Sequence, residues 1–405
     1  MSDPQPSADG NLTRSRRQLV LAICCMSLLI VGLDNTIVNV ALPSIGRDLH
    51  TTVSGLQWTV DAYTLVLASL LMLSGSMGDR FGRRRVFKLG LVLFTLASLL
   101  CSLAPSLGWL IAFRALQGVG GSMLNPVAMS IIRNVFTDAR ERAQAIGMWG
   151  ATVGVSLALG PVVGGALVDS AGWRSIFWIN IPVGLLALVL TIRFVPESRA
   201  PRPRRLDPVG EILVIVLLSS LTYAIIEAPS AGWASTQSIA LFALAAAALT
   251  GLLLYERQRH EPLLELGFFR SVPFSSASAT AVCAFAALGV FLFLNTLYLQ
   301  DVRHLSALEA GLYTLPLALM TLVFAPLSGR LVGRRGPRIS LLTGGLGLAL
   351  GGVLMTSIGR HTELASLLPA YFIFGIGFGM VNPPITNTAV MGMPSAQAGV
   401  AAAVA

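Results

Sequence analysis

The sequence predicts an all-α polytopic membrane protein, and three observations support this prediction. Of its 405 residues, 54% are hydrophobic and only 12% are charged, whereas a soluble domain carries about 25% charged residues. The apolar residues form repeated runs of about 20, the length that spans a bilayer. The basic residues responsible for the net charge of +9 lie in short loops between these runs. Because they form no continuous basic face with interleaved aromatic residues, nucleic acid is not expected as a partner.

Polar stretches divide the chain into six expected segments. They are, in order, a cytoplasmic tail (1–17), an N-terminal half of six helices (18–194), a cytoplasmic linker rich in Pro and Arg (195–206), two inserted transmembrane helices (207–255), a charged interfacial segment (256–271) and an incomplete second half of about four helices (272–405). The first apolar run is too long for a signal peptide, so it is expected to be the first span.

The arginine distribution predicts the orientation. With the N-terminus in the cytoplasm, 23 of the 28 basic residues fall on the cytoplasmic side and four outside, and Arg114 remains within a span. Basic loops stay in the cytoplasm, so the protein is expected to be a multi-pass protein of the cell membrane with a cytoplasmic N-terminus.

Two motifs occur twice. The stretch 75–85 (GSMGDRFGRRR) has a weaker copy at 329–338, at an offset of 254 residues, and 118–126 matches 375–383 at an offset of 257. Two matches at nearly one spacing indicate two pseudo-repeated halves separated by two extra helices. On this alignment the chain stops two helices before its second half is complete, so about 12 of the 14 spans of a longer parent are expected.

The first copy of the loop motif is expected to form a conformational switch. Its glycines, Gly75 and Gly82 among them, permit a tight turn and close helix approach. Asp79 is expected to accept hydrogen bonds from backbone N–H groups at a helix start. Arg80 and Arg83 would anchor the loop on the cytoplasmic side.

The sequence lacks the residue patterns typical of metal sites, enzymes and ATP-binding proteins. The four cysteines lie in apolar runs without ligand spacing, and the four histidines are scattered, so neither a metal site nor an enzyme's clustered catalytic set is expected. Lys88 is the only lysine and is followed by Leu89. No phosphate-binding GK[ST] loop therefore exists, and ATP is not expected to be the direct energy source.

Three charged residues lie inside spans at similar depth: Asp34, Asp61 and Arg114. Each costs at least about 2.5–3.5 kcal/mol to insert, so each is expected to face a cavity or a partner. A carboxylate that reaches the interface is the alternative for either aspartate, and a purely structural ion pair is the alternative for Arg114. Which of the two carboxylates takes which of these roles stays open.

The fifth span carries small residues at spacings near four: Gly154, Gly160, Gly164 and Gly165. Such spacing lets a neighbouring helix approach closely, and Pro161 removes one helical hydrogen bond. The pattern is typical of a rocking interface between two halves, with an ordinary packing face as the alternative.

These motifs resemble those of the major facilitator superfamily. The stretch 75–85 is similar to its loop motif, 110–120 to the arginine-bearing motif of its fourth helix, 154–165 to its antiporter motif, and 33–43 to a first-helix signature of the fourteen-helix drug:proton antiporter branch. In the second half, Gly333 stands in place of Asp79 and Tyr371 in place of Arg114, so that half keeps the scaffold without the charges.

The resemblance implies a secondary transporter that exports lipophilic, often cationic drugs or antibiotics in exchange for protons by alternating access. It needs no cofactor beyond the proton gradient, and its partners are drugs, protons and lipid, with a monomer expected. Asp34 and Arg114 are expected to couple protons, and Asp61, Asn35, Gln117 and Asn125 to bind substrate. The alternatives are a proton-coupled importer of the same fold and, from another class, a membrane receptor or membrane-embedded enzyme.

Overall fold

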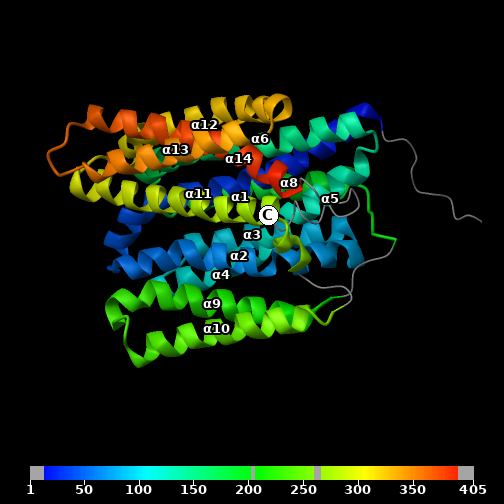
Figure 1. Ribbon diagram of the computed structural model, residues 1–405, viewed down its shortest axis with the longest axis horizontal. Helices are drawn as coiled ribbons and strands as arrows, with labels where there is room; N and C mark the ends of the chain where they lie inside the picture. Colours follow the sequence, from blue (N-terminus) through cyan, green and yellow to red (C-terminus); the bar gives the residue numbers. More distant parts are fainter. Residues whose placement is uncertain (1–12, 202–205, 260–265, 391–405) are drawn as a thin grey trace, which may run out of the picture.

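The computed structural model describes residues 13–201, 206–259 and 266–390, and its regular structure there is entirely helical (Figure 1). The helices are α1 (Arg14–Asp48), α2 (Val53–Phe81), α3 (Arg83–Ser102), α4 (Leu107–Ser122), α5 (Asn125–Val135), α6 (Ala139–Ala171), α7 (Ser175–Trp178), α8 (Asn180–Phe194), α9 (Pro208–Ala231), α10 (Thr236–Glu256), α11 (Val272–Leu297), α12 (Ala307–Arg335), α13 (Arg338–Thr356) and α14 (Leu368–Val390). Three short helical turns, η1 (Leu266–Arg270), η2 (Tyr298–Val302) and η3 (Leu364–Leu367), complete the described structure.

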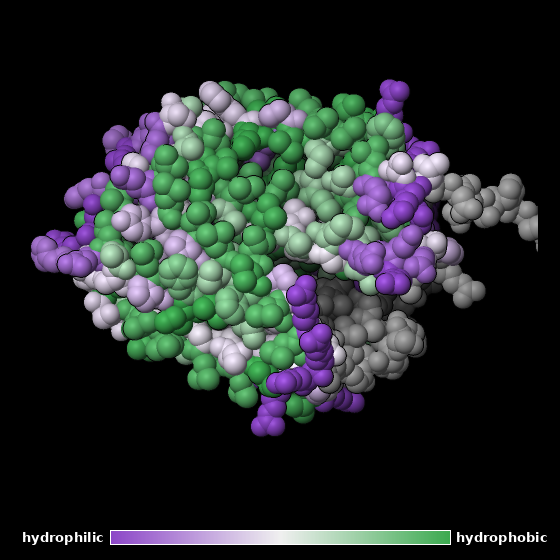
Figure 2. Space-filling model, turned by 90° about the horizontal axis from the view of Figure 1, so that it is seen from above, coloured by the Kyte–Doolittle hydropathy of each residue, from purple (hydrophilic) through white to green (hydrophobic). Residues whose placement is uncertain are grey.

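The helices are long and apolar enough to cross a membrane. Eleven helical segments among the described residues satisfy both criteria, and α4 and α5 together make one further pass. Figure 2 shows the consequence on one face: an apolar surface covers the middle of the molecule, and hydrophilic side chains gather towards its two ends. We call these ends the Arg14 end and the Asp48 end, after the first and last residues of α1.

Local sequence sets where helices begin and end. Asp138 accepts hydrogen bonds from the N–H groups of Arg140 and Glu141, which starts α6, and Ser306 with Glu309 forms a capping box at α12. Gly82 ends α2 with a φ of 112°, a conformation that favours glycine.

Helical structure is interrupted at two places in the N-terminal half, and proline explains both breaks. The apolar run from Leu107 to Ile132 is divided between α4 and α5. Pro126 has no N–H to donate to the carbonyl of Ser122, where the helix breaks. The sixth span divides into α7 and α8 in the same way, since Pro182 cannot donate to Trp178.

The helices form two bundles and one attached pair. In the first bundle α1 packs on α6 and α8, and α4 packs on α2 and α3; in the second, α14 packs on α11, α12 and α13. The pair α9–α10 lies at one edge of the molecule, where α9 packs against α2 (Figure 1). The bundles meet mainly where α6 packs along α12 and α1 along α11.

The expected segments of the chain can be compared with the helix bounds only in part. The tail was expected to extend to residue 17, but α1 already begins at Arg14, because Thr13 caps the helix by accepting from the N–H of Arg16. Residues 1–12, residues 202–205 of the linker and residues 260–265 of the interfacial segment lie outside the described residues.

Candidate functional site

A buried ion pair lies inside the first bundle. Arg114 Nη1 on α4 donates to Asp34 Oδ2 on α1 at 2.5 Å, and both side chains are fully buried. Asp34 Oδ1 accepts from Gln117 Nε2 and from Asn180 Nδ2, each at 2.8 Å. We call Asp34, Arg114 and Gln117 the buried polar trio. Three donors on α4 and α8 thus satisfy a carboxylate that belongs to α1.

The arginine is held on all sides. Its Nε donates to the backbone carbonyl of Thr59 at 3.1 Å, and its guanidinium carbon lies 4.4 Å from the ring centre of Tyr63 and 5.9 Å from that of Phe177. Aromatic faces attract a cation, most strongly when water is excluded. Arg114 Nη2 and the Tyr63 hydroxyl are buried without a hydrogen-bond partner among the described residues. The pair is therefore rigid, with unused hydrogen-bonding capacity.

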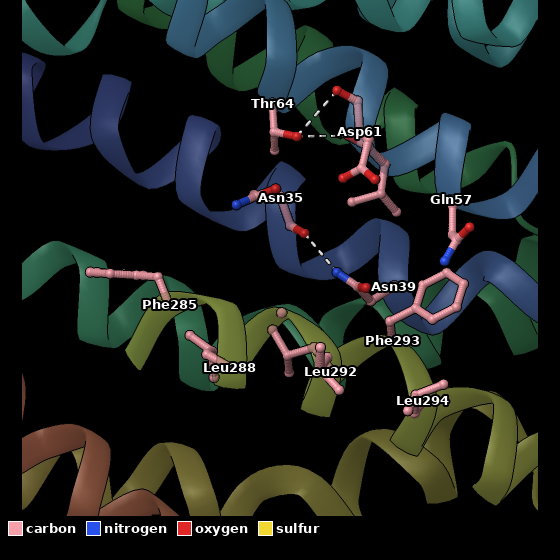
Figure 3. Close-up of a pocket in the computed structure, with 13 residues that line it drawn as sticks. Asn35, Asn39, Gln57, Asp61, Thr64, Phe285, Leu288, Leu292, Phe293 and Leu294 are labelled. Carbon is pink, nitrogen blue, oxygen red and sulfur yellow. Dashed lines mark hydrogen bonds between the residues drawn. The ribbon is translucent and has the colours of Figure 1, made fainter. Parts of the chain in front are cut away.

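A cavity of about 520 Å³ lies between α1, α2 and α11. Figure 3 shows that its polar side chains come from α1 and α2 and most of its apolar ones from α11. Its lining includes the polar residues Asn35, Asn39, Gln57, Asp61 and Thr64 and the aromatic residues Phe285 and Phe293. In the described part of the chain no ion pair involves Asp61. The cavity thus combines one carboxyl group outside any ion pair and several amides with an apolar, aromatic wall.

Three consecutive residues of α1 face three different environments. Asp34 joins the ion pair, Asn35 lines the cavity, and Thr36 contacts α6, where its hydroxyl lies 3.3 Å from the carbonyl oxygen of Ser156. A helix turns by about 100° per residue, which points neighbouring side chains in different directions. A shift of α1 therefore moves all three contacts together.

The glycines of α6 allow contacts with both bundles. A Cβ at Gly160 would lie 1.9 Å from the hydroxyl of Thr36 on α1, and one at Gly165 would lie 2.4 Å from the carbonyl of Ala307 on α12. Gly164 faces Ile37 of α1, and Gly154 and Pro161 face α12. Helix α6 is therefore packed tightly between the two bundles.

Hydrogen bonds between the bundles gather at the Asp48 end. Asp169, in the last turn of α6, accepts from the N–H groups of Ala307 and Leu308 at 3.1 and 3.0 Å. Gln300 Nε2 donates to the carbonyl of Val40 at 2.8 Å. No hydrogen bond between the bundles is found at the Arg14 end of the described chain.

The loop motif is mostly helical, which corrects the expectation of a turn around its glycines. Gly75, Asp79 and Arg80 lie inside α2, and only Gly82 forms the turn, since it alone has a positive φ there. Asp79 was expected to accept from backbone N–H groups, but it accepts from the guanidinium of Arg83 at 2.9 and 3.1 Å. The reason is that Asp79 lies in the last turn of α2 and Arg83 is the first residue of α3, so the guanidinium lies close to the carboxylate across the turn at Gly82.

The linker after α8 holds this loop from outside the motif. Glu197 accepts from the N–H of Arg84 at 3.1 Å and lies 3.6 Å from Nε of Arg85. Backbone hydrogen bonds join Arg83 to Ser198 and Asp79 to Ala200. The motif and the linker therefore form one structural unit, which their separation in the sequence did not suggest.

The structure brings some predicted site residues together and separates others. Asp34, Arg114 and Gln117 form one network, whereas Asp61 and Asn35 line the cavity. Gln117, expected to bind substrate, is fully buried in the network, because its amide satisfies both charged partners. Asn125 lies at the start of α5, outside the cavity lining.

Sequence reasoning missed Asn180, which completes the shell of Asp34, and the cavity residues Gln57 and Thr64. Each is a polar residue within an apolar run. That was the available signal, but it does not say which face of a helix meets which partner.

The second bundle contains three aromatic residues at a constant sequence offset from the buried polar trio. Positions 257 residues beyond the buried polar trio hold an aromatic trio, namely Phe291, Tyr371 and Phe374. The ring centres of Phe291 and Tyr371 are 5.3 Å apart, and those of Phe291 and Phe374 are 5.1 Å apart. Within each trio the side chains are therefore in direct contact. The members of the buried polar trio interact through charges and hydrogen bonds, and those of the aromatic trio through their rings.

Comparison with known proteins identifies the family. Residues 24–405 match the family description "Major Facilitator Superfamily". The chain belongs to this superfamily. As a major facilitator it is a membrane transporter and not an enzyme, and its all-helical fold agrees.

Curated relatives of this major facilitator are named for drug resistance or efflux. It is 38% identical to the multidrug resistance protein Stp of Mycobacterium tuberculosis (strain CDC 1551 / Oshkosh), over 96% of this chain and 73% of the relative. It is 35% identical to the multidrug efflux pump LfrA of Mycolicibacterium smegmatis, over 97% and 78%. It is 39% identical to the puromycin resistance protein pur8 of Streptomyces alboniger, over 96% and 78%.

Solved structures agree on the fold. A bacterial homologue of the human lysosomal transporter Spinster, in an inward-facing and unoccupied conformation, superposes with a TM-score of 0.69 at 19% identity, covering 97% of this chain and 79% of that one. The xylose transporter XylE from E. coli gives a TM-score of 0.64 at 17% identity, covering 96% and 85%.

Proposed function

We propose that this major facilitator exports lipophilic, often cationic drugs or antibiotics across the cell membrane in exchange for protons. Relatives 35–39% identical carry the names of multidrug or antibiotic efflux proteins. The proton gradient supplies the energy, and no cofactor is needed. A monomer suffices, because cavity and ion pair are built within one chain.

The observation that carries the proposal is the triple role of α1. Asp34 lies in the ion pair, Asn35 in the cavity and Thr36 against α6. Antiport requires that proton binding, substrate binding and the movement of the two halves influence one another. One helix with all three contacts on consecutive residues provides that link.

Asp34 is the proposed proton site. Arg114 stabilises the ionised carboxylate by direct attraction, and protonation removes that attraction. The guanidinium then keeps only its bonds to Gln117 and Thr59 and its aromatic contacts. The energetic difference between the two protonation states acts on α1 through Asp34, and thereby on the cavity and on α6. Asp61 is the second candidate for this role, because it is the one carboxylate that lines the cavity.

The cavity suits an amphiphilic cation. Asp61 provides a negative charge, the amides of Asn35, Asn39 and Gln57 provide hydrogen bonds, and α11 provides the apolar wall with Phe285 and Phe293. Such a mixture is the usual composition of small-molecule sites, and the two rings add a favourable surface for a cationic ligand.

The distribution of basic residues among the loops supports a cytoplasmic position for the Arg14 end. On this orientation the hydrogen bonds between the bundles close the outer side. The described conformation is then the one that faces the cytoplasm, from which an exporter collects its substrate.

The two bundles are proposed to be pseudo-repeats within the fourteen-helix drug:proton antiporter branch, with α9–α10 as the inserted pair. Equivalent helix contacts support this: Gly120 meets the backbone of Phe94, and 257 and 254 residues later Gly377 meets that of Leu348.

The test is drug-driven proton movement in proteoliposomes that contain the full-length protein and a pH-sensitive dye. Addition of a lipophilic cation on the cytoplasmic side should release protons from the opposite compartment into that side, and an uncoupler should abolish the signal. Drug uptake that continues without proton movement would overturn the antiport mechanism while leaving drug transport intact.

A further inference from the structure

Asp169 joins the two bundles at the Asp48 end. Its carboxylate lies in the last turn of α6, and its two oxygens accept from the backbone N–H groups of Ala307 and Leu308, the first two residues of α12. The first N–H groups of a helix have no partner inside that helix, and the helix dipole favours a negative charge beside them. A side chain of one bundle thus supplies a cap that the other bundle's helix needs.

The helices α6 and α12 pack closely beside this contact. A Cβ at Gly165, one turn before Asp169, would lie 2.4 Å from the carbonyl of Ala307, and one at Gly311 would lie 2.2 Å from the carbonyl of Pro161. The backbones of α6 and α12 therefore touch directly beside the cap. Separation of the bundles at this end must break both hydrogen bonds of Asp169.

We propose that Asp169 is the outer latch of this transporter, a positioning residue that stabilises the conformation closed at the Asp48 end. The inference rests on the proposed function for its assignment of that end to the outside. It also adds to that function, because it names the residue that holds one of the two access states. The latch acts on which side the cavity opens to, and it does not touch the substrate.

Asp138 provides a matched control. It lies at the other end of the same helix and accepts from two backbone N–H groups at 2.9 and 3.0 Å, but both belong to α6 itself. Asp169→Asn and Asp138→Asn therefore remove the same charge from the same kind of contact. Only Asp169→Asn removes it from between the bundles.

The experiment follows the accessibility of the cavity. The four native cysteines (Cys24, Cys25, Cys101, Cys283) are replaced by serine or alanine, and Gln57→Cys places one thiol in the cavity. A membrane-impermeant maleimide is then applied to right-side-out and inside-out vesicles. Asp169→Asn should raise the labelling rate from the Asp48 side at least about fivefold relative to the parent, the lower end of typical coupling between sites. It should lower the rate from the Arg14 side.

A second variant approaches the latch from the other bundle. Ala307→Pro removes one of the two N–H donors, and proline is tolerated at the first position of a helix. It should shift labelling in the same direction as Asp169→Asn, whereas Asp169→Glu keeps the charge and should label like the parent.

Unchanged labelling in both Asp169→Asn and Ala307→Pro would overturn the latch, and so would an equal rise in Asp138→Asn. The labelling ratio needs neither drug nor proton gradient. A protein that shows the shift but no drug export would therefore refute the proposed function and leave the latch in place.

Discussion

Neutralising the buried ion pair in two steps separates its structural from its chemical role. Asp34→Asn leaves a buried arginine without a counter-ion, and Arg114→Gln leaves a buried carboxylate held only by Gln117 and Asn180. Removal of one partner of a buried pair costs about 3–5 kcal/mol, because the other charge stays desolvated. Water does not screen the charge that remains in either single variant, because both side chains are 0% exposed.

The double variant Asp34→Asn/Arg114→Gln buries no charge. It should be at least as stable as either single variant, so the sum of the two single effects should exceed the double effect by about 3 kcal/mol. Unfolding in detergent, followed by a thiol-reactive dye, gives these differences. Substrate-driven proton exchange should be lost in all three variants, because none can protonate and deprotonate Asp34 against Arg114.

An exposed pair gives the control. Asp48 and Arg174 are 2.6 Å apart with side chains 47% and 37% exposed, and exposed pairs contribute about 0–1 kcal/mol. Asp48→Asn should therefore change stability little and leave exchange intact. Additive effects of the two buried substitutions would refute the ion pair as a coupled unit. Exchange of protons for a neutral drug at the parental rate in Asp34→Asn would move the proton site elsewhere, with Asp61 next to be tested.

Three further outcomes are expected. Asp61→Asn should weaken binding of cationic drugs, divalent ones most, and leave neutral drugs nearly unaffected, because it removes a charge and little volume; substrate-dependent fluorescence quenching measures this. Glu227 on α9 accepts from Ser54 and Trp58 of α2, so Glu227→Ala should raise the KM for transport roughly two- to fivefold at unchanged kcat, as α2 loses two hydrogen bonds. Gly160→Ala should abolish transport at normal expression, since its Cβ would lie 1.9 Å from a hydroxyl of α1, whereas Gly147→Ala, with nothing within 4 Å, should transport normally.

The sequence was informative about features that depend on the type of residue alone, such as the position of a span or the need of a buried charge for a partner. Apolar runs of about 20 residues located the spans, because a helix of that length crosses the bilayer and satisfies its own backbone hydrogen bonds there. Charged residues inside spans were expected to face a cavity or a partner, because each is costly alone, and the structure joins Asp34 to Arg114. Small residues on α6 predicted close approach, and Gly160 and Gly165 contact neighbouring helices.

What the sequence left open depends on direction around a helix. Asn180 and Gln117 are both amides within apolar runs, and only their orientation places them on Asp34. Proline positions are visible, but Pro161 lies within a continuous α6 whereas Pro126 lies at a helix break. Asp169 resembles any polar residue at a helix end, because its partner is 138 residues away in the chain.

The aromatic trio supports a functional origin for the charges of the buried polar trio. At positions 257 residues further along the chain, the second bundle has three aromatic residues, and the ring of Phe291 contacts those of Tyr371 and Phe374. Aromatic packing contributes to stability without the desolvation cost that a buried ion pair carries. If stability alone decided which residues occupy these positions, the first bundle could use the same solution. It retains a carboxylate and a guanidinium instead, and the carboxylate lies on α1, the helix that also lines the cavity and contacts α6. A group that can gain and lose a proton is what the aromatic trio cannot supply, and this is the property that the proposed exchange requires.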